Sequence, residues 1–492
     1  MYFGNNDPAL ATFNELIPKI NKGMDYWKQL KLTQIEKARA VEMFLASKLI
    51  YAMNFYPIPA NIQNKLQKDI FDFINFPQKV ITIAEKEMWK TKSHGGIKLI
   101  NIQIKSETSK VKWLIEMAST PALKTNLHIF TTLVGRQKGY IDGRDLIFLS
   151  KSYMQHQMKT DSKFYKEALL AVSKLDIRKG IKKVEDWDQE HLFYNQLFMK
   201  ENGKLLVLTK YCEENNIYVL DQLLEEKIKE NAKLPFDKVL TNMLSKILLN
   251  TNVPREDMLV INAREEISIT KLTQKQLYEA SLLLIERDHH SQVKWVIKLN
   301  IAIRWEDVWN NVHNVLTTNQ TKSIIWQQIH LNFYTQFSYN TWHQTQDPCP
   351  LCNKIPENIF HIILQCEFVN KLWETIEPLL KELYPATVTE EERAFGIVQK
   401  NSPVGIILRN WLTYLLRDSI MKEEREAYYS SKSNLEKFKK KFNQTVGMEM
   451  KMKIFRYKNE GNLELLDKVI THGEVLCQKQ ENGDYQIRDT FT

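Results

Sequence analysis

Apolar residues recur along the chain at intervals of three and four, which places them on one face of an α-helix. One series begins at Thr33, where Thr-Gln-Ile-Glu forms a capping box, a pattern that opens helices. Its apolar stripe consists of Ile35, Ala38, Val41, Leu45 and Leu49. The sequence predicts that this helix ends before Pro57, because a residue that precedes proline disfavours the α conformation.

A second helix is predicted between Ala60 and Pro77. Its apolar stripe consists of Ile62, Leu66, Ile70, Phe73 and Ile74. Only the short connection Pro57-Ile58-Pro59 separates it from the first helix. We therefore expect a helical hairpin in which the two stripes pack against each other.

Similar patterns run through residues 107–175 and 190–330, and a further helix begins after residue 366. The apolar stripe of that helix is Val369, Leu372, Trp373, Ile376, Leu380 and Leu383. Near the end of the chain, Asn482-Gly483 lies between two extended runs, which is a signal for a β-hairpin. The predicted fold class is mostly α: a multi-domain helical array with a C-terminal β-hairpin.

Composition narrows the class of protein. The 492 residues, 43% of them apolar, suffice for two to four domains with sizeable cores. The 68 lysines and arginines exceed the 59 acidic residues, and the net charge of +9 favours polyanionic partners. No run of about eighteen apolar residues occurs, so no membrane partner is expected. With scarce cysteine and no secretory start, we expect an intracellular protein of the cytoplasm or nucleus.

Three of the five cysteines lie close together with one histidine, in the run from residue 349 to residue 366. Cys349, Cys352, His361 and Cys366 have spacings that suit one tetrahedral Zn²⁺ ion. Four protein ligands leave no open position, so the zinc is predicted to be structural. In the alternative interpretation the cysteines are buried thiols and the histidine belongs to a core. His343 is a possible substitute ligand.

Two glycines are candidates for a structural turn, and several groups of charged residues are candidates for contacts with nucleic acid. Gly95-Gly96 predicts an unusual backbone turn after an exposed basic stretch. The lysines Lys437, Lys439, Lys440 and Lys441 interleave with Phe438 and Phe442, as a surface that contacts phosphates and stacks on bases would require. Alternatively the phenylalanines face a core. The basic residues 178–183 are interpreted as a solvated connection, with a phosphate contact as the alternative. The polar residues 288–290 are interpreted as a surface loop.

Several of these motifs, in this order, resemble the C-terminal part of a non-LTR (LINE-type) retrotransposon reverse transcriptase. The thumb-like matches are Trp27, residues 30–37, residues 46–51, Pro57, Phe73-Ile74 and residues 95–99. The zinc-knuckle matches are Cys349-Pro-Leu-Cys352, Glu357-Asn358, His361, Cys366 and Trp373. Trp305, Trp309, Trp326 and His330 resemble the helices that precede the knuckle in this family, and residues 394–396 and 409–411 resemble the segment C-terminal to the knuckle.

The resemblance implies a fragment of an RNA-directed DNA polymerase that binds template RNA or target DNA, with retroelement RNA or its ribonucleoprotein as partner. It places Lys31, Lys37, Arg39 and Lys48 on the thumb helix as phosphate contacts. Polymerisation needs paired aspartates that hold two Mg²⁺ ions, and the chain contains no Asp-Asp pair. We therefore expect no enzymatic activity from this chain alone and assign no catalytic residue.

The predicted domains are an N-terminal remnant (1–25), a thumb-like helical hairpin with the Gly-Gly turn (26–105), a helical connecting region (106–325), a zinc-knuckle domain (326–385) and a C-terminal helical segment with the basic stretch and hairpin (386–492). Two alternatives remain. In one, the chain is a zinc-locked helical scaffold that binds proteins and not nucleic acid. In the other, it is an inert pseudogene product.

Overall fold

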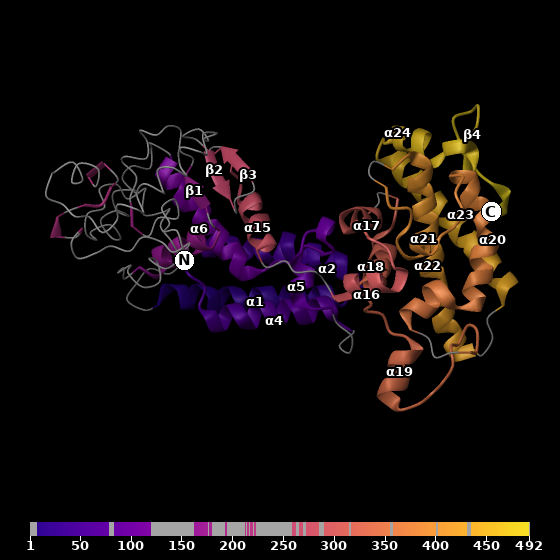
Figure 1. Ribbon diagram of the computed structural model, residues 1–492, viewed down its shortest axis with the longest axis horizontal. Coiled ribbons are helices and arrows are strands. Elements are labelled where there is room, and N and C mark those ends of the chain that lie inside the picture. The colour runs from indigo at the N-terminus through magenta and orange to yellow at the C-terminus, as the bar shows by residue number, and fades with distance from the viewer. Residues whose placement is uncertain are drawn as a thin grey trace. The chain divides into compact units, whose positions relative to one another are not determined.

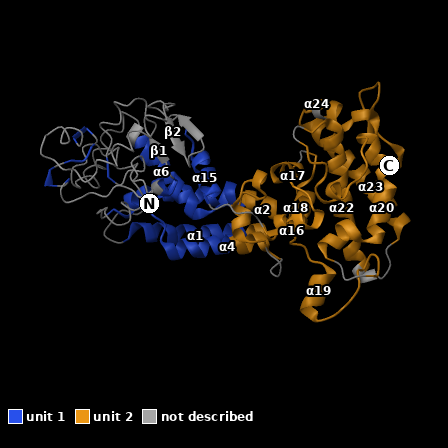
Figure 2. Cartoon of the chain, viewed as in Figure 1, with its two compact units in different colours: residues 1–25, 41–70, 100–286 blue, residues 26–40, 71–99, 287–492 orange. Residues whose placement is uncertain are grey.

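The computed structural model is mostly helical (Figure 1). It describes residues 7–77, 83–119, 162–175, 272–284, 290–313, 316–354, 358–399, 402–430 and 434–491, with short pieces between 177 and 268. These residues form two compact units, each built from separate stretches of the chain (Figure 2). Unit 1 contains residues 1–25, 41–70 and 100–286, and unit 2 contains residues 26–40, 71–99 and 287–492. The five predicted domains are consecutive segments instead, and their boundaries stay a prediction.

The chain begins with a series of helices, two of which the sequence predicts. They are α1 (Pro8–Lys28), α2 (Gln34–Ala40), the π-helix η1 (Val41–Ala46), α3 (Ser47–Met53), α4 (Ala60–Asn75), α5 (Glu85–Trp89), the 3₁₀ turn η2 (Lys92–His94) and α6 (Ile102–Ser119). Next come α10 (Lys163–Lys174) and α15 (Gln274–Leu283). The later helices are α16 (His290–Leu299), α17 (Trp305–Val312), α18 (Asn319–Ile329), α19 (Gln336–His343), the π-helix η5 (His361–Gln365), α20 (Glu367–Leu383), α21 (Glu390–Phe395), α22 (Val404–Ser430), α23 (Leu435–Asn459) and α24 (Leu463–Leu465). Short turns complete the C-terminal part: η6 (Leu466–Ile470), η7 (His472–Glu474) and η8 (Asp489–Phe491).

The predicted helix after Thr33 and its partner are both present. The capping box forms, since the Thr33 hydroxyl accepts the Glu36 N–H at 3.3 Å and the Glu36 carboxylate accepts the Thr33 N–H at 2.9 Å. All ten predicted stripe residues of the two helices are buried. The Gln34 side-chain amide donates to the Asn75 side chain at 3.0 Å, so the first helix begins where the second ends. The two helices therefore run antiparallel, as a hairpin requires.

One turn of the first helix differs from the expected α conformation. Residues 41–46 form the π-helix η1. The apolar positions Val41, Leu45 and Leu49 recur at intervals of four, slightly more than one α-helical turn. A wider π turn keeps such positions on one face. All three side chains are buried.

Unit 1 also contains a small sheet that the helical patterns do not predict. The strands β1 (Ile177–Lys179), β2 (Met258–Ile261) and β3 (Glu265–Ser268) pair antiparallel in the order β1-β2-β3. Leu259 lies opposite Ile267 in the β2-β3 register. The expectation of helix throughout residues 190–330 is wrong here, because this short run of branched residues followed by a three-residue connection favours a hairpin.

The core of unit 2 is rich in tryptophan. Five indole rings are fully buried: Trp295, Trp309, Trp326, Trp373 and Trp411. The long helix α22 packs against α18, α20 and α23. The predicted C-terminal hairpin is confirmed: β4 (Cys477–Lys479) pairs antiparallel with β5 (Tyr485–Ile487), and Gly483 in the turn has a φ of +82°.

The Gly95-Gly96 turn is confirmed, and it is tightly enclosed. Gly95 has a φ of +85°, in the left-handed region that glycine tolerates best. Its carbonyl oxygen accepts hydrogen bonds from the Trp326 indole at 2.7 Å and from His330 Nε2 at 2.8 Å. A Cβ on Gly96 would lie only 1.9 Å from the Lys90 carbonyl oxygen. The two glycines thus allow the turn to lie directly against the Lys90 backbone and the rings of Trp326 and His330.

We expect Gly96→Ala to lower the stability of unit 2 by about 2 kcal/mol or more, because the added methyl group overlaps the Lys90 backbone. The control is Gly483→Ala, where the φ is positive but no atom lies within 4 Å of the added Cβ. This control should cost about 1 kcal/mol. Urea unfolding followed by tryptophan fluorescence compares the two. Equal losses would contradict the steric explanation.

Candidate metal centre

The first two cysteines of the predicted site lie on a tight loop after α19. The Cys349 carbonyl oxygen accepts the Asn353 N–H at 2.7 Å, which closes the turn. Asn353 adopts a φ of +56°, a conformation that asparagine tolerates better than most residues. Within this turn the Lys354 backbone N–H donates to Cys352. The loop therefore brings both sulfur atoms to one side.

The other two residues lie where η5 passes into α20. The Asn358 side chain accepts the His361 N–H at 3.0 Å and fixes the start of this segment. The Cys366 N–H donates to the His361 carbonyl oxygen at 2.7 Å. Cys366 is the N-cap residue of α20, so its sulfur lies at the positive end of the helix dipole.

The structure brings the four predicted residues together. The ligand atoms of Cys349, Cys352, His361 and Cys366 all lie within 4.8 Å of one another. Cys352 Sγ is 3.4 Å from His361 Nε2. Tetrahedral zinc–sulfur and zinc–nitrogen bonds of ordinary length would separate these atoms by roughly 3.5 Å. The group could therefore hold a metal ion, and its donor set of three thiols and one imidazole is one that zinc prefers.

The group is largely buried, and hydrogen bonding favours the thiolate form of one of its cysteines. Cys349, His361 and Cys366 are buried, and Cys352 is half-buried. Hydrogen bonding from Cys349 lowers the pKa of Cys366 to about 4, assisted by His361 and by the Val369 backbone N–H, although burial opposes the shift. Burial raises the pKa of Cys352. A thiolate at Cys366 is the form that binds metal.

The four residues are anchored to the core of unit 2. The Phe360 ring packs edge-on against Trp295, with ring centroids 4.7 Å apart. The six predicted stripe residues of α20 are all buried. Lys354 in the cysteine loop forms an ion pair with Glu367 in the first turn of α20. His343, the possible substitute ligand, lies outside the group, since its exposed ring packs on Tyr339 with centroids 4.3 Å apart.

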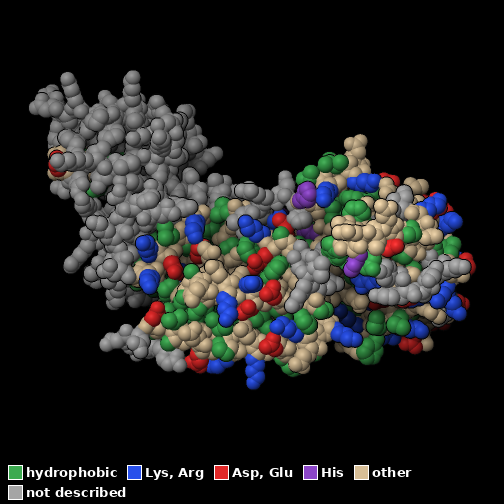
Figure 3. Space-filling view, turned by 90° about the horizontal axis from the view of Figure 1, so that it is seen from below, with side chains coloured by type: hydrophobic (Ala, Val, Ile, Leu, Met, Phe, Trp, Pro, Cys, Tyr) green, Lys and Arg blue, Asp and Glu red, His purple; other side chains and the backbone are tan. Residues whose placement is uncertain are grey.

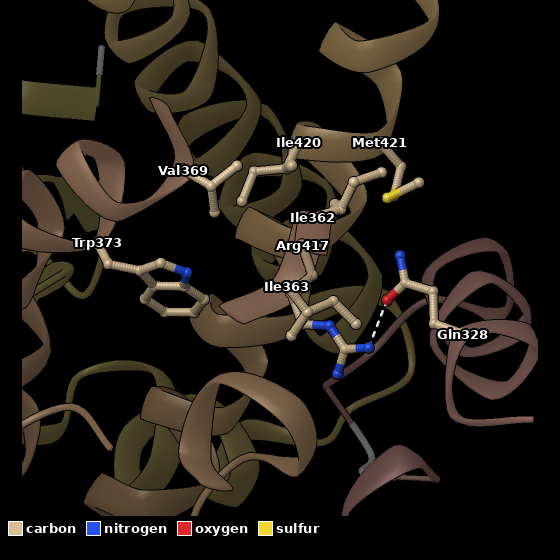
Figure 4. Close-up of a pocket in the computed structure, with 8 residues that line it drawn as sticks. All are labelled: Gln328, Ile362, Ile363, Val369, Trp373, Arg417, Ile420 and Met421. Carbon is tan, nitrogen blue, oxygen red and sulfur yellow. Dashed lines mark hydrogen bonds between the residues drawn. The ribbon is translucent and has the colours of Figure 1, made fainter. Parts of the chain in front are cut away.

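A small cavity lies next to this segment (Figure 4). Its volume is about 10 Å³, room for about one water molecule. The lining residues are Gln328, Ile362, Ile363, Val369, Trp373, Arg417, Ile420 and Met421. The buried Arg417 guanidinium donates to the Gln328 side-chain oxygen across one end (Figure 4). This space is too small for a substrate or cofactor.

The tryptophan motif upstream of the knuckle surrounds the Gly-Gly turn. The Trp309 ring stacks on His330 with centroids 5.0 Å apart, and Trp326 meets the same imidazole edge-on at 4.9 Å. Both Trp326 and His330 donate to Gly95. Motifs more than two hundred residues apart in the sequence thus form one packed cluster within unit 2.

The motifs downstream of the knuckle also meet. Asn410 accepts the Ile397 N–H at 2.7 Å, and the Tyr414 hydroxyl donates to the Phe395 carbonyl oxygen at 2.6 Å. Arg409 is fully buried and forms a bidentate ion pair with Glu392. These contacts tie α22 to α21 and to the loop after it.

The predicted phosphate contacts fall into different environments. Lys31, Arg39 and Lys48 are exposed. Lys37 is buried, its ammonium donates to the Phe76 carbonyl oxygen, and burial lowers its pKa. This placement argues against Lys37 as a phosphate contact, because its charge is already engaged within unit 2.

The lysine-rich start of α23 presents charge but no aromatic stacking surface. Lys437, Lys439 and Lys440 are exposed, and Lys441 pairs with Glu426 at 2.5 Å. Phe438 and Phe442 are buried with ring centroids 6.4 Å apart, so the alternative in which they face a core is correct.

Some predictions lie wholly or partly outside the described residues. Of the basic cluster 178–183, only Arg178 and Lys179 are described, in β1. Asp288 and His289 lie outside, and His290 begins α16. Within the described part of the chain, no helix has the length and apolar character needed to cross a membrane. Comparison with known protein-family models and with curated proteins finds no match to this chain.

Proposed function

We propose that the chain is the thumb, connecting and zinc-knuckle portion of a non-LTR retroelement reverse transcriptase. In this proposal it binds RNA or DNA in the cytoplasm or nucleus. Cys349, Cys352, His361 and Cys366 hold one structural Zn²⁺ ion. The chain itself contains no Asp-Asp pair, so it binds nucleic acid without polymerising it.

One observation carries this proposal: most of the separated motifs on which the resemblance depends lie together in unit 2, whereas residues 46–51 and Pro57 belong to unit 1. The Gly-Gly turn, the tryptophan helices, the knuckle and the residues after it share one core. Nothing in their local sequence requires the Trp326 indole and the His330 imidazole to meet the Gly95 carbonyl oxygen. Contacts between motifs support the view that the resemblance concerns a fold and not isolated short patterns.

The zinc would act as a structural element. With all four positions occupied by protein ligands, the metal has no site for water or substrate. It joins the cysteine loop to the start of α20, whose buried stripe packs in the core of unit 2. The metal would therefore stabilise the cysteine loop and its junction with α20, and it would take no part in bond chemistry.

We expect the purified chain to contain one zinc ion and to bind a hairpin RNA or a duplex DNA. Phosphate contacts release counterions, so the affinity should fall at least about tenfold between about 50 mM and about 200 mM salt. Metal analysis and fluorescence anisotropy at both salt concentrations test this. A chain that contains zinc but binds neither RNA nor DNA at the lower salt concentration would contradict nucleic-acid binding. The zinc-locked scaffold would then be the remaining interpretation.

The scaffold alternative is favoured by a specific observation. Many basic side chains of unit 2 pair with acidic neighbours, and blue and red side chains are interspersed on the face that Figure 3 shows. Such pairs are Lys381–Glu377, Lys422–Asp418, Lys441–Glu426, Lys458–Asp484, Lys468–Glu464, Lys479–Asp467 and Arg488–Glu382. Paired surface charges weaken attraction to polyanions. A nucleic-acid site in unit 2 must therefore lie where cations outnumber acids.

A further inference from the structure

One face of the helix α23 carries cations and an aromatic ring but no acidic side chain. At 3.6 residues per turn, the acidic residues Glu436 and Glu449 of this helix lie roughly 100° or more around its axis from Phe455. Five lysines lie within about 60° of Phe455 instead: Lys437, Lys440, Lys441, Lys451 and Lys458. We name these five lysines and Phe455 the outer face of α23.

The outer face is open to solvent, whereas the opposite side of the helix is anchored. Four of its lysines are exposed, and Lys441 is half-buried. The exposed fraction of Phe455 is 70%. On the opposite side α23 packs against α20 and α22 through the buried residues Phe438, Phe442, Val446, Met450 and Tyr457. The fold therefore fixes the helix in place and leaves its outer face accessible to a partner.

Three lysines of the outer face have no acidic partner. Lys441 pairs with Glu426, and Lys458 pairs with Asp484 at 3.1 Å. Lys437, Lys440 and Lys451 form no ion pair with any acidic side chain that the structure describes. This surface thus differs from the rest of unit 2, where many basic side chains are paired. An anion could reach these three lysines without displacing a carboxylate.

The acidic residues beside the outer face are engaged by other cations. Glu449 pairs with Lys453 at 2.9 Å, and the Lys453 ammonium also lies 5.2 Å from the Trp411 ring centroid. Glu460, just after the helix, pairs with Arg456 at 2.8 Å. These two cations lie off the outer face, so the pairs leave its charge unaltered.

The position of Phe455 among the lysines suits a single-stranded nucleic acid. Lys451 precedes the ring by about one helical turn and Lys458 follows it by slightly less, so cations lie on both sides of it. From Lys437 to Lys458 the face is about 32 Å long. Proteins that bind single strands combine such a track of cations for phosphates with a ring on which a base stacks. In a duplex the bases already stack on one another, so an exposed ring has no base to receive.

The apolar part of this surface is small. Besides Phe455 it contains Met448 and Met452, with exposed fractions of 64% and 51%. A helix that lies in a lipid surface needs an apolar face along its length, and three apolar side chains on a helix of 25 residues are few for that purpose. The excess of lysines therefore favours a polyanion over a membrane.

We propose that the outer face of α23 binds a single-stranded nucleic acid. Lys437, Lys440 and Lys451 contact phosphate oxygens, and the Phe455 ring stacks on a base. This inference rests on the proposed function, in which the single strand is template RNA. It extends the site beyond the lysines at 437–441 and supplies the stacking ring that the buried Phe438 and Phe442 do not provide.

The first test compares two variants of the full chain that remove equal charge. Lys440→Gln with Lys451→Gln alters the outer face, and Lys294→Gln with Lys298→Gln alters exposed positions on α16. The probe is a single-stranded oligouridylate. The outer-face variant should bind it about fivefold or more weakly at low salt. Its slope of log affinity against log salt should become less steep by roughly 1.4, because each phosphate contact on a single strand contributes about 0.7. The α16 variant should bind as the unaltered chain does.

The second test removes the ring and keeps an apolar side chain. Phe455→Leu should weaken oligouridylate binding about fivefold or more, because leucine offers no surface on which a base stacks. Its salt slope should stay unchanged, since stacking releases no counterions. Phe455→Trp should restore the affinity. With a blunt RNA duplex as probe, Phe455→Leu should have no effect. Because the side chain is exposed, the urea midpoint of both variants should match that of the unaltered chain.

The outcomes separate this site from the proposed function. If the unaltered chain binds oligouridylate and the outer-face variant binds it equally, the site is wrong and the proposed function survives. Unaltered binding by Phe455→Leu would likewise overturn the stacking role. If the unaltered chain binds neither RNA nor DNA at low salt, both proposals fail. Vesicles of phosphatidylserine and phosphatidylcholine are a third probe: lysine-dependent binding to them, without binding to oligouridylate, would make the outer face a membrane contact and overturn this inference.

Discussion

Replacing Cys352 with serine should release the bound metal and unfold the segment around residues 345–385. Cys352 supplies one of four ligand atoms, and its partner His361 Nε2 lies 3.4 Å away. Structural zinc sites contribute about 10–16 kcal/mol of apparent binding free energy in small peptides, and that energy is folding energy. Because a domain is stable by only about 5–15 kcal/mol, losing a substantial part of it removes the local fold.

The measurement combines metal content with tryptophan fluorescence, since Trp295 packs against Phe360 beside the site. The matched control is Cys477→Ser, another buried cysteine, which lies in β4 outside the metal group. It should cost about 1–3 kcal/mol for placing a hydroxyl in a buried position, and it should keep the metal. A Cys352→Ser chain that retains both zinc and unaltered stability would remove the structural metal from the proposal.

The features that the sequence predicts well depend on neighbours in the chain. The stripe from Val369 to Leu383 is readable because helical periodicity is local, and all six residues are buried as expected. The knuckle is readable because a CxxC turn and a nearby helix start determine where the sulfurs point. The Asn482-Gly483 hairpin likewise arises from turn chemistry. In each case the physical cause lies within about twenty residues.

The features that the sequence does not predict depend on distant partners. Strand β1 exists because Ile177 pairs with Ile261, and nothing near residue 177 indicates that pairing. Nothing in the local sequence distinguishes Lys37 from a surface lysine. Yet its ammonium donates to the Phe76 carbonyl oxygen and lies 5.6 Å and 5.8 Å from the ring centroids of Phe73 and Phe76.

Arg409 is a buried charge, and its removal should lower the stability of unit 2. Its guanidinium pairs with both carboxylate oxygens of Glu392, at 2.6 and 2.7 Å. It also donates to the carbonyl oxygens of Leu380, Tyr384 and Ala386, at the C-terminal end of α20. Both members of the ion pair are almost completely buried. The arginine thus satisfies one buried carboxylate and three backbone acceptors.

We expect Arg409→Met to destabilise unit 2 by about 3–5 kcal/mol, because it leaves the Glu392 carboxylate buried without a counter-charge. The control is Arg488→Met, since the Arg488–Glu382 pair is exposed and should contribute less than about 1 kcal/mol. Urea midpoints of both variants measure the difference.

Adding Glu392→Gln to Arg409→Met should recover at least about 1 kcal/mol of the lost stability, because the double variant no longer buries an unpaired carboxylate at residue 392. A simple sum of the two single losses would show that the ion pair contributes no coupling. In that case the three carbonyl oxygens at the end of α20, and not Glu392, would account for the cost of removing Arg409. This double-mutant cycle therefore separates two roles of Arg409: hydrogen bonding to the end of α20, and neutralising the charge of Glu392.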